Sequence, residues 1–190
     1  MPAATTSRRL RLAIVAVVAL LALVAAACSD TADATGELPD LADVPGADTG
    51  AASGDIAPDF TVETLDGAGF TLSEHLASDG RPVFLNMWAS WCPPCRAEMP
   101  DIDAAADAHS DVKFIGIAAS DEPESAAGFA ASIDIGYTIG FDEHGVVARD
   151  YNVPGLPSSY IISAEGEILE QIFGAVTKAD IDEKLEKYFG

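Results

Sequence analysis

The chain has 190 residues, 49% of them hydrophobic, which suits one folded domain with appendages rather than two full domains. Its formal net charge of −21 at pH 7 argues against binding to nucleic acid and against electrostatic adsorption to anionic lipid. Its cysteines, Cys28, Cys92 and Cys95, are too few for a disulfide-framed mini-protein or a four-cysteine zinc site.

The first 27 residues are typical of a bacterial export signal. A basic region, Ser-Arg-Arg-Leu-Arg at residues 7–11, precedes an uninterrupted apolar run over residues 12–27. This run is shorter than the roughly 20 residues that span a bilayer comfortably, and it ends in small residues. Because Cys28 follows directly, residues 1–27 resemble a lipoprotein signal peptide, which is cleaved before a cysteine that is then lipidated. Ala25 stands where such signals usually carry Leu, so plain secretion and an uncleaved anchor helix remain alternatives.

Lipidation of Cys28 would also remove a third thiol, which could otherwise form mixed disulfides with the other two cysteines. Residues 28–54 are rich in Asp, Ala, Gly, Thr and Pro and have too few large apolar residues to offset the entropy of ordering. We therefore expect Cys28 to be a lipid anchor and residues 28–54 to be a flexible acidic tether. The predicted location is the outer face of the cytoplasmic membrane, or secretion if no anchor remains.

Residues 55–190 alternate between short apolar runs and helical stretches. The first half predicts a hairpin at residues 60–72 and a buried strand at residues 82–88. A helix with an internal proline at residues 93–109 and a second buried strand at residues 112–118 follow. The second half predicts a helix from Pro123, a strand at residues 138–141 and a short helix at residues 143–151. A hairpin at residues 159–173 and a terminal helix at residues 177–190 follow. This order indicates an α/β fold, a central mixed sheet with helices on both faces and an N-terminal β-hairpin extension.

Cys92 and Cys95 stand just after the predicted strand at 82–88, where a helix begins. Two intervening residues let both sulfurs reach disulfide distance with little backbone strain. The helix dipole favours a thiolate at Cys92, while Cys95, one turn in, is expected to be buried and to resolve a mixed disulfide. Pro94 has no N–H, so the Cys95 amide is the nearest donor to the Cys92 sulfur. We expect moderate thiolate stabilisation and a fairly reducing potential.

Other uses of the two cysteines fit less well. A c-type haem site needs His directly after the second cysteine, where Arg96 stands. Structural zinc needs two further ligands, and the three histidines are scattered without metal-like spacing, so we interpret them as surface or cap residues. A structural disulfide that closes so short a loop would stabilise the fold little. We therefore predict a redox centre with no metal and no cofactor.

The segment VFLNMWASWCPPCRAEMP, residues 83–100, resembles the active-site region of the thioredoxin superfamily, in particular its extracytoplasmic membrane-tethered reductases that serve cytochrome c maturation. The resemblance runs from about Ile56 to Gly190. It implies a thioredoxin-like fold and the reduction of disulfides in client proteins such as apocytochrome c. We further expect a redox partner in the membrane and a monomeric domain.

The resemblance also assigns roles around the cysteines. Gly155-Leu156-Pro157 resembles the loop whose cis-proline faces the active pair, so Pro157 is the cis candidate. The Leu156 backbone would then pair with an extended substrate strand. Trp91, Pro93 and Pro94 are expected to form a docking surface, although an ordinary packing role for Trp91 remains open.

Glu98 has two interpretations. It matches a glutamate of the cytochrome-maturation branch, whereas Asn86 occupies the position beneath the cysteines where ordinary thioredoxins have an acidic residue. A buried Glu98 would titrate high and could exchange a proton with Cys95. Alternatively, Glu98 is a solvated first-turn carboxylate that the helix dipole favours.

Two other functions remain as alternatives to the reductase. Peroxiredoxins share the fold, but the Pro and Thr or Ser that precede their reactive cysteine correspond here to Leu85 and Ala89. A non-catalytic lipoprotein that uses the fold as a binding scaffold is the other alternative, because a fold alone is a poor guide to function.

Overall fold

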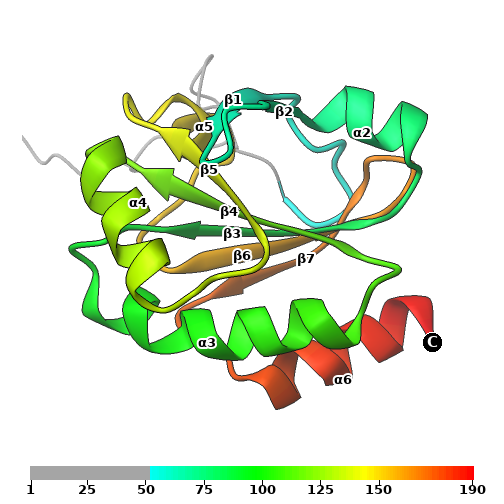
Figure 1. Cartoon of the computed structure of the whole chain (residues 1–190). Coiled ribbons are helices and arrows are strands. Elements are labelled where there is room, and N and C mark those ends of the chain that lie inside the picture. The colour runs from blue at the N-terminus through cyan, green and yellow to red at the C-terminus, as the bar shows by residue number, and fades with distance from the viewer. Residues whose placement is uncertain (1–51) are drawn as a thin grey trace, which may run out of the picture. The chain divides into compact units, whose positions relative to one another are not determined.

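Two continuous apolar runs form the centre of the sheet. A computed structural model describes residues 52–190 (Figure 1). In it β3 (Val83–Trp88) and β4 (Lys113–Ala119) pair in parallel, with Asn86 opposite Gly116. All six residues of β3 are buried, as expected for a strand covered on both faces. The predicted central strand is confirmed.

Within residues 52–190, five further strands complete a mixed sheet of order β2-β1-β5-β4-β3-β6-β7. They are β1 (Thr61–Thr64), β2 (Phe70–Thr71), β5 (Thr138–Asp142), β6 (Ser158–Ile162) and β7 (Ile168–Phe173). β5 is parallel to β4, whereas the pairs β1–β2, β1–β5, β3–β6 and β6–β7 are antiparallel. Both predicted hairpins, β1–β2 and β6–β7, are confirmed.

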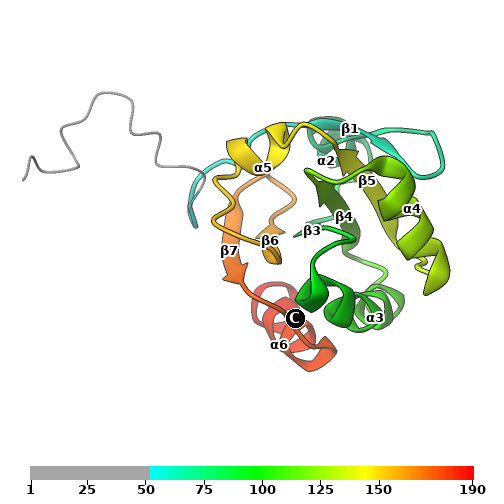
Figure 2. The same ribbon diagram turned by 90° about the vertical axis from the view of Figure 1, so that its left-hand side faces the viewer.

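Helices cover both faces of the sheet, as Figures 1 and 2 show. The helices on one face are α3 (Pro93–Ala108), α4 (Pro123–Ser132) and α6 (Lys178–Phe189), and those on the other are α2 (Leu72–Ser78) and α5 (Val146–Asp150). This is the predicted thioredoxin-like α/β architecture.

Alternate residues of β3 point to opposite faces. Phe84 and Trp88 belong to the hydrophobic cluster beneath α3, α4 and α6. Leu85 and Met87 belong to the cluster beneath α2 and α5. Asn86 lies between Leu85 and Met87, so its side chain enters the α3 side, where the two cysteines also lie.

The predicted hairpin over residues 60–72 extends one residue too far, because its second strand ends at Thr71 and Leu72 begins α2. The first turn of α2 is capped from outside the helix: Asp59 accepts hydrogen bonds from the main-chain N–H of Ser73 at 2.9 Å and from its hydroxyl at 2.7 Å. A cap 14 residues away lies beyond the range of a local pattern. By contrast, α6 begins with the predicted capping box of Thr177 and Asp180.

Gly116 permits a close approach between β4 and two aromatic rings. A Cβ atom at this position would lie 3.0 Å from Cε2 of Tyr137 and 3.1 Å from Nε1 of Trp88. Both rings are buried and cannot move aside freely. The missing side chain therefore lets the Trp88 indole pack directly onto the strand.

The predicted signal peptide, Cys28 and nearly all of the predicted tether lie outside the described residues. Near the start of those that are described, Gly54 donates its main-chain N–H to the carbonyl of Ile168 at 2.7 Å. None of the helices between residues 52 and 190 has the length and apolar character needed to cross a membrane.

Candidate active site

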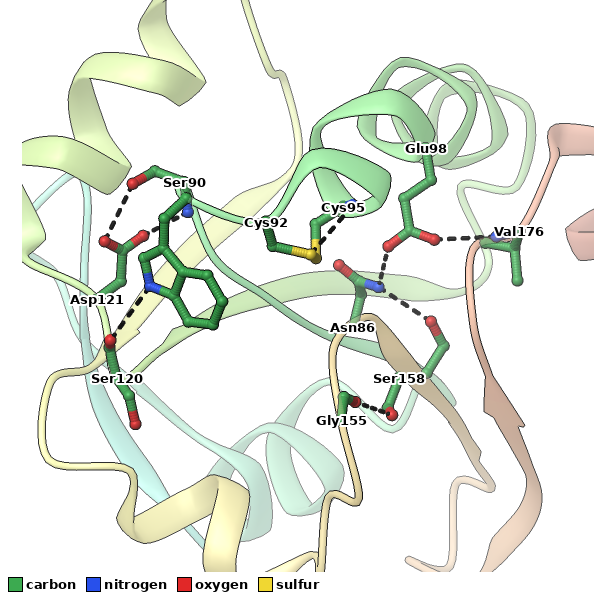
Figure 3. Close-up of a disulfide and its surroundings, with 12 residues drawn as sticks. Asn86, Ser90, Cys92, Cys95, Glu98, Ser120, Asp121, Gly155, Ser158 and Val176 are labelled. Atoms are coloured by element: carbon green, nitrogen blue, oxygen red, sulfur yellow. Dashed lines mark hydrogen bonds between the residues drawn. A yellow bond between two sulfur atoms is a disulfide. The ribbon is translucent and has the colours of Figure 1, made fainter.

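Cys92 and Cys95 form a disulfide at the N-terminus of α3 (Figure 3). Their Cα atoms are 5.3 Å apart, and Cys92 is the N-cap residue of the helix. The Cys92 sulfur accepts the main-chain N–H of Cys95 at 3.3 Å. Cys95 is completely buried, as predicted, while Cys92 retains 4% exposure. Cys92 is thus the less buried of the two cysteines.

The two prolines between the cysteines limit the hydrogen bonds that reach this sulfur. Pro93 and Pro94 occupy the first two positions of α3, and both are exposed. Neither has an N–H group, so two of the free donors that a helix N-terminus normally offers are missing. The Cys95 amide is the main-chain donor that remains.

A buried carboxylate fixes the segment that precedes Cys92. Asp121, in the loop after β4, accepts hydrogen bonds from the main-chain N–H and, at 3.0 Å, the hydroxyl of Ser90, and from the N–H of Glu122 at 2.9 Å. Trp91 is 62% exposed, and its Nε1 donates to the Ser120 carbonyl at 3.4 Å. Asp121 is absent from the sequence-based predictions.

The bond between Leu156 and Pro157 is cis, which confirms that prediction. It directly precedes β6, and the Ser158 hydroxyl donates to the Gly155 carbonyl at 2.7 Å. Leu156 and Trp91 line one groove of about 370 Å³, whose wall also includes Arg149. The cis-proline loop and the exposed tryptophan therefore border the same surface beside the disulfide.

Glu98 is buried, with 2% exposure, so its interpretation as a solvated carboxylate is wrong. Its Oε2 accepts the main-chain N–H of Val176 at 2.9 Å, and its Oε1 accepts Nδ2 of Asn86 at 2.9 Å. Burial raises the pKa of Glu98 to about 7, although these two hydrogen bonds to the charged form oppose the shift. A carboxyl group that changes protonation near neutral pH thus lies one turn from Cys95.

Asn86 links Glu98 to the sheet. Its Nδ2 also donates to the Ser159 hydroxyl on β6 at 3.0 Å, and the side chain is fully buried. Figure 3 shows the carboxamide between Glu98 and the disulfide. The sequence identified Asn86 as a departure from ordinary thioredoxins, but it gave no sign of Ser159 or Val176 as partners.

His75 and His109 make ordinary hydrogen bonds within the fold. His75 Nε2 lies 3.0 Å from the Arg81 carbonyl, and His109, the C-cap residue of α3, pairs with Asp182 at 2.8 Å. Residues 52–190 contain no group of three or more His, Cys, Asp or Glu side chains arranged to hold a metal ion.

Comparison with known proteins places this site in a family. Residues 53–171 match the model of the AhpC/TSA family. The chain is 34% identical over 143 residues to the thioredoxin-like protein YneN of Bacillus subtilis, covering 73% of this chain and 82% of that protein. It is 34% identical over 142 residues to the thiol-disulfide oxidoreductase ResA of Geobacillus kaustophilus, covering 73% and 79%. The thiol:disulfide interchange protein HelX of Rhodobacter capsulatus is 32% identical over 143 residues, covering 75% and 80%.

Solved structures that resemble this fold are also named as disulfide interchange proteins or oxidoreductases. A putative thiol:disulfide interchange protein DsbE from Chlorobium tepidum superposes with a TM-score of 0.67 at 28% identity, covering 74% of this chain and 99% of that one. A secreted Mycobacterium tuberculosis disulfide oxidoreductase superposes with a TM-score of 0.61 at 29% identity, covering 67% and 95%. With its Cys92–Cys95 disulfide at the head of α3, the chain belongs to the AhpC/TSA family and, within it, to the thioredoxin-fold thiol-disulfide oxidoreductases.

Proposed function

We propose that the protein reduces disulfides of client proteins outside the cytoplasmic membrane, and that apocytochrome c is a client. The observation that carries this proposal is the Cys92–Cys95 pair at the head of α3, where Cys92 caps the helix and is 4% exposed while Cys95 lies one turn in and is completely buried. Thiol–disulfide exchange needs this asymmetry, because one thiol must attack the client and the other must release it.

The reaction proceeds in two exchanges. The Cys92 thiolate attacks one client sulfur, the client S–S bond breaks, and the other client sulfur leaves as a thiolate that takes up a proton. Cys95 then loses its proton and attacks the Cys92 sulfur, which releases the second client thiol and restores the Cys92–Cys95 disulfide. Glu98, with a pKa raised by burial to about 7, is suited to accept the proton from Cys95 at neutral pH.

The reducing direction is supported by the few donors at Cys92. A thiolate is stabilised by nearby N–H groups, and strong stabilisation of the reduced form makes a disulfide oxidising. Pro93 and Pro94 leave the Cys95 amide as the main-chain donor to the Cys92 sulfur. We therefore expect a low reduction potential.

The groove beside the disulfide suits an extended client segment. Trp91 and Leu156 line it, and Pro93 and Pro94 form the adjoining exposed turn. The main-chain N–H and C=O of Leu156 make no hydrogen bond within residues 52–190, so they are available to pair with a client strand.

The reduction potential tests the direction. The purified protein is equilibrated with reduced and oxidised dithiothreitol, and the two forms are separated after acid quenching and alkylation. We expect a value below about −200 mV, on the reducing side of the disulfide isomerase range. A value above about −150 mV would contradict a reductase, since strong oxidants lie near −120 mV.

Trapping tests the catalytic roles. A Cys95→Ala variant should accumulate mixed disulfides with clients through Cys92, whereas the matched Cys92→Ala variant should accumulate none. Identification of apocytochrome c among the trapped proteins would support the proposed client. If Cys95→Ala captured nothing in cells, the scaffold alternative would be favoured. Rapid consumption of hydrogen peroxide with a thiol reductant would favour the peroxidase alternative instead, which Ala89 argues against.

We also propose that Cys28 carries the lipid that holds the protein at the outer face of the membrane, near a membrane redox partner. The apolar run before Cys28 supports an export signal. Cys28→Ser should move the protein from the membrane fraction to the soluble extracytoplasmic fraction and abolish labelling by a fatty-acid analogue. Retention of Cys28→Ser in the membrane would indicate an uncleaved anchor helix.

A further inference from the structure

Three buried side-chain polar atoms in residues 52–190 have no hydrogen-bond partner: Nε1 of Trp88, the Tyr137 hydroxyl and Oδ1 of Asn86. Of the three, Oδ1 of Asn86 carries no hydrogen atom and can only accept. The Asn86 side chain is fully buried, and its Oδ1 makes no hydrogen bond within the described part of the chain. Buried polar atoms nearly always have a partner, because losing water without compensation costs free energy. An orphan acceptor in the active site therefore calls for a physical explanation.

The orientation of this amide is fixed by its nitrogen. Nδ2 donates to Oε1 of Glu98 at 2.9 Å and to the Ser159 hydroxyl at 3.0 Å, so both amide hydrogens are used. Turning the amide over would place Oδ1 against the carboxylate of an ionised Glu98, where two acceptors would face each other. When Glu98 is ionised, Oδ1 therefore occupies the opposite end of the carboxamide.

That opposite end is the side of the cysteines. Figure 3 shows the Asn86 oxygen turned toward the disulfide and the nitrogen turned toward Glu98. Cys95 and Glu98 are three residues apart on α3 and thus share one helix face above β3. In the disulfide neither sulfur carries a hydrogen atom, so Oδ1 has no donor there.

We propose that Asn86 is a positioning residue of the exchange reaction, whose Oδ1 accepts a hydrogen bond from the Cys95 thiol in the reduced protein. When a dithiol donor reduces the protein, the Cys92–Cys95 bond breaks and the donor's sulfurs form a new one. Two electrons and two protons pass to the pair, and the proton on Cys95 supplies the missing donor. The proposal rests on the thiol–disulfide exchange of the proposed function, but on no particular client.

Two consequences follow for the reaction. The acceptor stabilises the reduced form over the oxidised form, and it favours the thiol of Cys95 over its thiolate. The same amide contacts Glu98, so one rigid group lies between the resolving thiol and its proposed proton acceptor. Tyr137, before β5, interacts electrostatically with Glu98, while β6 contributes the uncharged Ser159 to the amide.

Infrared spectroscopy of the S–H stretch tests the contact directly. In the full chain with Cys28→Ser and Cys92→Ser, Cys95 is the only thiol. We expect its stretch at the low frequency of a hydrogen-bonded thiol. Asn86→Leu should move it to the frequency of a free thiol, whereas Asn86→Asp, which keeps an oxygen at this position, should not. A free-thiol frequency with Asn86 present would overturn the proposal, even if Asn86→Leu did not fold.

The redox equilibrium separates a direct effect from one that acts through Glu98. With dithiothreitol as the redox buffer, Asn86→Leu should lower the equilibrium constant for reduction about three- to tenfold, as expected for one hydrogen bond. A tenfold change corresponds to about 30 mV in this two-electron couple. The same fall should appear in a Glu98→Gln background. If the fall disappeared there, Asn86 would act only through Glu98. Because no client is needed, failure here is distinguishable from failure of client trapping.

Discussion

The titration of Glu98 makes the stability of the oxidised protein depend on pH. Burial raises its pKa from 4.5 to about 7 in the folded state. Between these values the unfolded chain ionises Glu98 while the folded protein holds it neutral. Stability is therefore complete below the unfolded pKa and declines as the pH rises through the folded pKa. A difference of this size corresponds to a loss of about 3 kcal/mol above pH 7.

Glu98→Gln should remove this loss. Gln resembles the protonated carboxyl, because each has one carbonyl oxygen. This oxygen can accept from the Asn86 amide or from the Val176 N–H, but not from both. We therefore expect the variant to match the native protein near pH 4.5 and to be about 3 kcal/mol more stable at pH 8.

Urea unfolding of the oxidised proteins at pH 4.5, 6, 7 and 8 measures the effect. Glu183→Gln, an exposed carboxyl on α6, serves as the matched control and should show no such trend. A free-energy difference between Glu98→Gln and the native protein that stayed constant from pH 4.5 to 8 would refute the reasoning, because it would show that Glu98 titrates alike in both states.

Three further changes probe the residues that hold the site. Asp121→Ala removes the acceptor of the Ser90 N–H, so we expect a loss of about 1–3 kcal/mol and slower reduction of insulin disulfides, with Asp121→Asn intermediate in both assays. Gly116→Ala should lower stability by about 1–3 kcal/mol in thermal unfolding, because the new methyl group would lie 3.0 Å from Tyr137 and 3.1 Å from Trp88 and both buried rings would have to shift; an unchanged melting temperature would show that the rings yield easily. Thr177→Ala should cost about 1 kcal/mol by removing the cap of α6 while leaving the redox potential unchanged.

The predictable part of the fold is the part that neighbouring residues encode. The apolar run of β3, the proline that begins α4 and the capping box of α6 are each visible within a few residues. The same holds for the reactive pair, because its chemistry depends on a spacing of three positions and on the start of a helix. The cis bond before Pro157 came from family resemblance, since local sequence rarely indicates that geometry.

The missed contacts join residues that are distant in the chain. Glu98 meets Val176 across 78 positions, and Asn86 meets Ser159 across 73. The rule that a buried polar group needs a partner predicts that such contacts exist, but it does not name the partner. For this reason the sequence left the burial of Glu98 open, whereas the packing of α3 and of the segment before α6 against the sheet decides it.

Asp121 differs from these cases, because the order of the predicted strands and helices is enough to place it beside the segment before Cys92. Two buried strands separated by a helix are expected to be parallel neighbours, so their carboxyl ends meet at one edge of the sheet. β3 ends at Trp88, just before the reactive segment, and β4 ends at Ala119, just before Asp121. An acidic side chain there faces free N–H groups of the segment that leads into Cys92. The geometry of the cysteine pair therefore depends on the loop after β4 as well as on its own motif, and a variant in that loop should alter exchange without touching either cysteine.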